Sequence, residues 1–181
     1  SAGTMTDLGT LGTSSVGHGI NARGQVIGES WLSSGGEHAF LYSDGVMSDL
    51  GTLGGANSQG TDINDRGQIT GSSQTSTGEG RAFLYANGVM TDLGSLGGNS
   101  VGLGINARGQ VVGVSLTSSG TNARLHAFLY SEGTMYDLNG LLAPGFGSIL
   151  SEALGINDSG QIVANSSSHA YLLTPVVNAT V

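Results

Sequence analysis

Short apolar runs, each flanked by Gly, Ser, Asn or Asp, follow one another along the whole chain. Four kinds of run occur in a fixed order, and their first examples are SVGHGIN (15–21), QVIGES (25–30), HAFLY (38–42) and MSDLG (47–51). Each run is too short for a helix, and none places its apolar residues at a 3.6-residue period. The pattern predicts an all-β chain of short strands.

The set of runs is itself repeated. The methionine of a Met-x-Asp-Leu motif recurs at Met5, Met47, Met90 and Met135, which are 42, 43 and 45 residues apart. Such a period indicates a repeat architecture. We therefore expect a single domain over residues 1–181, built of four repeats of about 43 residues.

Two turn signals join the runs within each repeat. The first is Asn-x-x-Gly, which begins at Asn21, Asn64, Asn106 and Asn157. The second joins the third run to the fourth and reads Asp44-Gly45, Asn87-Gly88 and Glu132-Gly133. Both signals are typical of tight hairpins, because Asn bonds within its own turn and Gly accepts a positive φ. Four antiparallel strands per period of 40 to 50 residues are typical of a β-propeller blade.

The number of runs predicts how such a ring would close. The fourth kind of run follows only the first three repeats, and it occurs once more near the N-terminus, over residues 4–8. We expect this strand to complete the last blade, which gives a four-bladed β-propeller of four-stranded antiparallel blades closed by the N-terminal strand. Closure removes exposed sheet edges. The alternative is a fragment of a longer array.

Composition excludes several classes of function. Only 10% of residues are charged, the formal net charge is −8, and all five basic residues are Arg. A nucleic-acid-binding protein needs a basic face, which this chain cannot supply. No apolar run approaches the length of a membrane span. With no Cys, disulfides and thiol catalysis are excluded. The bias towards Gly, Ser and Thr favours an extracellular or cell-surface protein.

The segments HAFLYSDGVMSDLGTLGG (38–55) and INARGQVVG (105–113) resemble the HAF-repeat family of bacterial extracellular repeat proteins. The His-Ala-Phe triplet occurs at residues 38–40 and 126–128, while Arg81 and Tyr171 depart from it in the other two repeats. The resemblance covers residues 3–175 and implies export and a propeller-like fold. It supplies no catalytic residues.

Repeated polar residues are expected to be structural. We expect the His of each HAF triplet to hydrogen-bond a neighbouring blade. The Asp of each DLG motif should cap the glycine-rich joint between blades, and its positions are Asp7, Asp49, Asp92 and Asp137. A ring of these four carboxylates around a cation is the alternative.

Residues that break the repeat are better candidates for a ligand site. On the first strand of each repeat these are His18, Gln59, Asp62 and Glu152, and in a variable joint the single tryptophan, Trp31. Carboxylates around a central channel could hold calcium. Asp62 and Glu152 could also act as an acid–base pair, since glycosidases use two carboxylates across a cleft. An indole beside Ser and Thr suits the face of a sugar.

These observations lead to an expected function. We expect a non-catalytic extracellular binding or scaffold module of a surface or matrix assembly, with an extracellular protein or glycan as partner and no enzyme activity. The alternatives are a glycan-binding, lectin-like propeller and a hydrolase that uses the channel carboxylates. Self-association is a further expectation, through the apolar joint from Leu141 to Leu150.

Overall fold

A computed structural model of the chain describes residues 3–143 and 145–176. Its strands form four separate antiparallel sheets, one for each repeat. The first sheet contains β1 (Ser14–Ile20), β2 (Val26–Trp31), β3 (Glu37–Ser43) and β4 (Val46–Asp49). The second contains β5 (Gly54–Ile63), β6 (Ile69–Thr75), β7 (Gly80–Ala86) and β8 (Val89–Asp92).

The third sheet contains β9 (Ser100–Ile105), β10 (Val111–Leu116), β11 (Leu125–Ser131) and β12 (Thr134–Asp137). A short 3₁₀ helix, η1 (Leu138–Leu141), follows it. The fourth sheet has only three strands, β13 (Glu152–Ile156), β14 (Ile162–Asn165) and β15 (Ala170–Leu173). No helix within the described ranges is long and apolar enough to cross a membrane.

Both predicted kinds of hairpin are confirmed. Gly24 adopts a φ of +76° where β1 turns into β2, and the backbone N–H of Gly24 donates to the carbonyl of Asn21. The second kind places both turn residues at positive φ, as at Asp44 (53°) and Gly45 (84°). Each strand is therefore hydrogen-bonded to its neighbour in the sequence, and the strands of every sheet run up and down in order.

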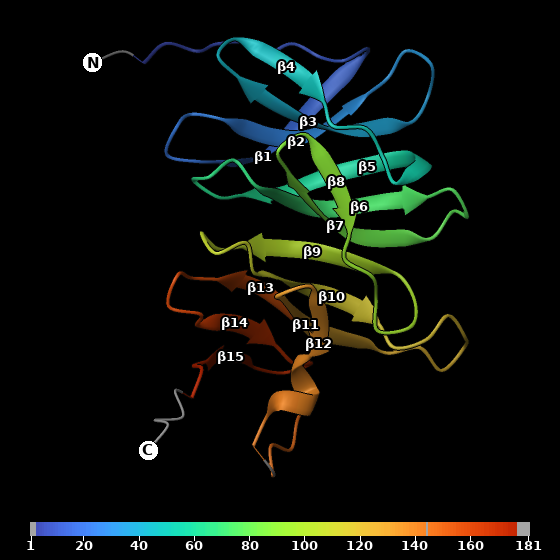
Figure 1. The fold of residues 1–181 in the computed structure, drawn as a ribbon, viewed down its shortest axis with the longest axis vertical. Coiled ribbons are helices and arrows are strands. Elements are labelled where there is room, and N and C mark those ends of the chain that lie inside the picture. The colour runs from blue at the N-terminus through green and yellow to red at the C-terminus, as the bar shows by residue number, and fades with distance from the viewer. Residues whose placement is uncertain (1–2, 144, 177–181) are drawn as a thin grey trace.

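The predicted closure is wrong. The sheets follow one another along the long axis, so that the first and the last lie at opposite ends of the stack (Figure 1). Residues 3–13 belong to no strand, and within the part of the chain that the structure describes no fourth strand lies beside β15. The all-β, antiparallel organisation is confirmed, but the four sheets form an open stack. Closure would require a contact between elements at the two ends of the chain, which no local turn enforces.

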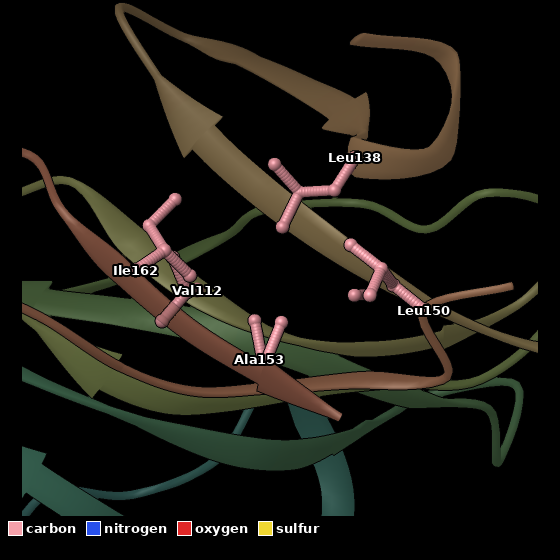
Figure 2. Packing of buried hydrophobic residues seen from close by; sticks show 7 residues of the cluster. Val112, Leu138, Leu150, Ala153 and Ile162 are labelled. Carbon is pink, nitrogen blue, oxygen red and sulfur yellow. The ribbon is translucent and has the colours of Figure 1, made fainter. Parts of the chain in front are cut away.

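Apolar side chains between consecutive sheets hold the stack together. Between the third and fourth sheets, Val112 and Leu138 pack against Leu150, Ala153 and Ile162, and all five are almost completely buried (Figure 2). Equivalent clusters join the first sheet to the second and the second to the third. Burial of apolar area is the main stabilising contribution.

A ladder of asparagine amides runs along one edge of the stack. The Nδ2 of Asn21 donates to the carbonyl of Asn64, Asn64 donates in the same way to Asn106, and Asn106 to Asn157, at 2.8 to 3.1 Å. The first three Asn are buried, but Asn157 is exposed, and among the described residues its Nδ2 donates only to Gln161. The hairpin tips thus also connect one repeat to the next.

Candidate active site

A buried glutamate lies between the first and second sheets. Glu29 of β2 is 6% exposed. One of its carboxylate oxygens, Oε2, lies 2.8 Å from Nε2 of His18 and accepts a hydrogen bond from the Gln59 amide at 2.9 Å. A carboxylate is costly to bury unless charge or hydrogen bonds compensate it, and here both neighbours do so. The three residues come from β1, β2 and β5.

A β-bulge places His18 beside this carboxylate. The pairing of β1 with β2 shifts between Gly17 and Gly19, so His18 is the extra residue of the bulge. The other three sheets shift at the equivalent position, where the residues are Thr61, Leu103 and Leu154. Every sheet therefore has the bulge, but a histidine occupies the bulge position only in the first sheet. Bulges commonly re-aim a side chain next to a functional site.

Gln59, which donates to Glu29, also lines a polar groove, whereas His18 lines a separate shallow hollow on β1. The groove has a volume of about 260 Å³ and crosses the first three sheets. Its polar lining includes Asn57, Gln59, Ser72, Gln74 and Asn99, with Glu37 as the only charged residue. Amide and hydroxyl groups of this kind bind neutral ligands that carry many hydroxyl groups. The volume is near the lower limit of small-molecule sites, roughly 300 Å³, which suits a ligand of about one ring.

The geometry allows acid–base chemistry at His18. The 2.8 Å approach of Nε2 to the Glu29 carboxylate favours the tautomer with the proton on Nε2, which leaves the lone pair of the neutral ring on Nδ1, and no described residue bonds to that atom. The side chain of His18 keeps 28% of its accessible surface, so solvent reaches it. A histidine oriented by a buried carboxylate is a common arrangement for a general base.

The structure does not bring Asp62 and Glu152 together in any recorded contact. Asp62 accepts hydrogen bonds from the backbone N–H groups of Ile63 and Ile105, each at 2.9 Å, and so links the second sheet to the third. Burial raises the pKa of Asp62, and the two backbone hydrogen bonds oppose that rise. Glu152 accepts a hydrogen bond from Asn165 within the fourth sheet. Their role as an acid–base pair therefore stays an untested prediction.

Trp31 lies at the end of β2, paired with Ser14 and Glu37, and it is not among the residues that line the groove. Within the described residues, no group of three or more His, Asp or Glu side chains is arranged to hold a metal ion. The expectation of a calcium site therefore gains no support from this geometry.

The repeated His and Asp residues bond to each other. His38 contacts Asp49 at 2.9 Å, and His126 contacts Asp137 at 2.7 Å. Each pair joins adjacent strands of one sheet, so the expected bond to a neighbouring blade is wrong. The predicted capping by Asp is confirmed, because Asp49 accepts from Gly51 N–H and Asp137 from Asn139 N–H.

We expect the His126–Asp137 pair to make stability depend on pH. Burial raises the pKa of Asp137, but the hydrogen bond from His126 and two from Asn139 outweigh it, so the pKa is lowered overall. A carboxyl with a lowered pKa stabilises the fold above its unfolded pKa, and this contribution is lost as pH falls through the folded pKa. Asp137→Asn should cost about 1 kcal/mol or less at pH 7 because the pair is partly exposed. In urea unfolding, the difference from the wild type should shrink in acid.

Asp92→Asn is the matched control for that measurement. Asp92 makes the same turn hydrogen bond to Gly94 N–H, but Arg81 replaces the His of its repeat. If Asp137→Asn lowers the free energy of unfolding no more than Asp92→Asn does at every pH, His126 contributes nothing to stability.

Glu29 is the functional candidate that sequence reasoning missed. Its equivalents in the other repeats are Ser72, Val114 and Asn165, so it breaks the repeat as clearly as His18 does. Glu29 lies on the second strand of the repeat, whereas His18, Gln59, Asp62 and Glu152 all lie on the first.

Comparisons with known proteins identify no family for this chain. No protein-family model matches the sequence, and no curated protein matches it. One solved structure has a similar fold, that of a protein named as a "putative gluconolactonase", at 16% identity and a TM-score of 0.49. The similarity covers 89% of this chain and 60% of the other, so this chain spans less than two thirds of that protein.

This comparison contradicts the expectation of a non-catalytic module without enzyme activity, because the protein with the similar structure is named as an enzyme. The expectation of a scaffold is corrected accordingly. At this identity and TM-score the similarity identifies neither a reaction nor a residue of this chain.

Proposed function

We propose that this chain is a hydrolase in which His18, oriented by Glu29, is the general base towards a small, neutral, hydroxyl-rich ester. The observation that carries the proposal is the 2.8 Å contact between the His18 imidazole and a glutamate that is 6% exposed. The groove that Gln59 lines would bind the hydroxyl groups of the substrate, and Gln59 connects it to the base through its hydrogen bond to Glu29.

The reaction follows from the tautomer that Glu29 selects. Nδ1 of His18 takes a proton from a water molecule, whose oxygen attacks the ester carbonyl carbon. The carbon–oxygen bond to the leaving alcohol then breaks, and the imidazolium returns the proton to that alcohol. Glu29, 2.8 Å from Nε2, would stabilise the imidazolium by its negative charge, and the Gln59 amide keeps the carboxylate in place. General base catalysis of this kind contributes about 10²- to 10⁴-fold.

The test is a panel of chromogenic esters of simple sugars and polyols, assayed with purified protein. We expect His18→Ala to lower kcat/KM by about 100-fold or more, and Glu29→Gln to lower it by a smaller factor. His38→Ala is the matched control, because His38 also contacts a carboxylate but belongs to the repeated scaffold. An active protein with full activity after loss of His18 would contradict the proposal.

Glycan binding is a second candidate, favoured by the amide lining of the groove. Calorimetry with the same sugars separates the two. Binding without turnover, weakened by Gln74→Ala, would favour recognition over hydrolysis. Quenching of Trp31 fluorescence by the sugar would instead place the ligand at that indole.

We also propose that the chain is exported and belongs with the HAF-repeat proteins. The support is the repeated His-Ala-Phe and DLG motifs, together with low charge and the lack of Lys and Cys. A periplasmic or extracellular hydrolase would meet its neutral substrates there.

A further inference from the structure

The last sheet has an apolar hollow where its fourth strand would lie. The hollow has a volume of about 490 Å³, and its apolar lining includes Leu129, Leu138, Leu141, Leu142 and Leu173. It lies beside β15, whose second edge is paired with no strand among residues 3–143 and 145–176. An unpaired edge offers a row of free backbone groups to another strand.

In the preceding sheets a methionine occupies the equivalent place. Met90 of β8 packs in one cluster with Leu41, Leu50 and Leu53 of the preceding repeat. Met135 of β12 does the same with three leucines of the second repeat, which are Leu84, Leu93 and Leu96. Leu129, Leu138 and Leu142 are the third such group of leucines, and the last sheet supplies no methionine to it.

The outer face of the last sheet is built as an interface. Val163 of β14 is 42% exposed, whereas its equivalents in the first three sheets are completely buried against the next sheet; these are Ile27, Thr70 and Val112. Leu172 of β15 is 67% exposed, although its equivalents are partly buried between sheets. Asn157, at the end of the asparagine ladder, has no next carbonyl among the described residues to receive its amide.

The opposite end of the stack carries the complementary features. Ile20 is 68% exposed, whereas Ile63 and Ile105, its equivalents in the next two sheets, are each 6% exposed. Residues 4–7 read Thr-Met-Thr-Asp, which is the motif of the missing strand, and Met5 is 97% exposed. The donor strand and its acceptor are thus both present, at opposite ends of one stack (Figure 1).

We propose that a second copy of this chain docks on the last sheet, with residues 4–7 of that copy as its fourth strand. By the pairing of Tyr85 with Met90, Met5 would lie opposite Leu173 and fill the leucine-lined hollow. The first sheet of the second copy would cover Val163 and Leu172 with its own Ile20. The contact repeats the interface that the chain makes three times within itself, and it is head-to-tail, so it produces a ring or a filament.

The first experiment measures the mass of the purified chain in solution by sedimentation over a range of concentrations. We expect the wild type to associate as concentration rises and Met5→Glu to stay monomeric. Since Met5 makes almost no contact within the chain, the variant should fold as the wild type does. Val89→Glu is the matched control, because Val89 is also exposed (61%) and apolar but belongs to an inner sheet. It should associate like the wild type.

The second experiment mixes two variants that are each monomeric alone. Met5→Glu keeps an intact acceptor sheet, and Leu172→Glu keeps an intact donor strand, so together they should form a one-to-one complex. A wild type that stays monomeric at all concentrations would overturn the proposal. A monomer whose unfolding temperature drops with Met5→Glu would also overturn it, since the strand would then pair with its own chain.

Discussion

Gly71→Ala is expected to destabilise the protein by about 3 kcal/mol or more, because a β-carbon at this position has no room. It would lie 1.9 Å from the carbonyl oxygen of Gln59 on β5 and 3.0 Å from the ring of Phe83 on β7. Phe83 is completely buried, so neither neighbour can move without opening the sheet. For a chain of this length the unfolding temperature should fall by about 6 to 12 °C.

Two substitutions control for effects that are not steric. Gly140→Ala adds the same β-carbon where nothing lies within 4 Å, and it should leave stability almost unchanged. Ala164→Gly reverses the change at the equivalent position of the last sheet, where alanine is accommodated, and should cost about 1 kcal/mol. If Gly71→Ala loses no more stability than Gly140→Ala, the strands separate easily at this point.

The equivalent glycines explain why this part of the fold could be predicted. Gly28 and Gly113 would place a β-carbon 1.9 and 2.0 Å from the backbone of the neighbouring strand. Requirements of this kind, like the positive φ of Gly24 and Gly45, are local, so they leave a signal at the same place in at least three of the four repeats. Strand order and hairpins follow from such signals alone.

The partners of polar side chains left no comparable signal. The pairing of His126 with Asp137 depends on the register of β11 with β12, and the sequence does not state which carboxylate the ring will meet. Closure by residues 4–8 failed for the same reason, because it joins the two ends of the chain. A strand motif in the sequence identifies a segment that can add to a sheet. Which sheet it joins depends on where the sheets lie in space.

Among the positions that break the repeat, some belong to the candidate site and others are structural. His18 and Gln59 stand out because they break the repeat, and the structure joins them through Glu29. Asp62 also breaks the repeat, but its carboxylate accepts a hydrogen bond from the backbone N–H of Ile105 and so has a structural role. An irregular position therefore indicates a local requirement, and only the contacts between sheets show whether that requirement is structural or chemical.

Asn64→Ala is expected to cost about 3 kcal/mol, as the second large effect on stability. The Oδ1 of Asn64 accepts hydrogen bonds from the backbone N–H groups of Arg66 and Gln68, which close the hairpin. Its Nδ2 donates to the Asn106 carbonyl of the next sheet at 2.8 Å. The side chain is 7% exposed, so water cannot easily replace the lost partners.

Asn157→Ala separates the two contributions. Asn157 makes the same hydrogen bonds within its turn, to Ser159 and Gln161, but it is exposed and donates to no further sheet among the described residues. Its loss should therefore cost about 1 kcal/mol, and the difference of about 2 kcal/mol measures the bond between sheets together with its burial.

Urea unfolding followed both by Trp31 fluorescence and by circular dichroism would check this, since Trp31 reports on the first sheet alone. If the two variants lose equal stability, the hydrogen bonds of the asparagine ladder contribute nothing between repeats, and the apolar clusters alone stabilise the packing of the sheets. If the two probes separate only in Asn64→Ala, the ladder is what makes the four sheets unfold as one unit.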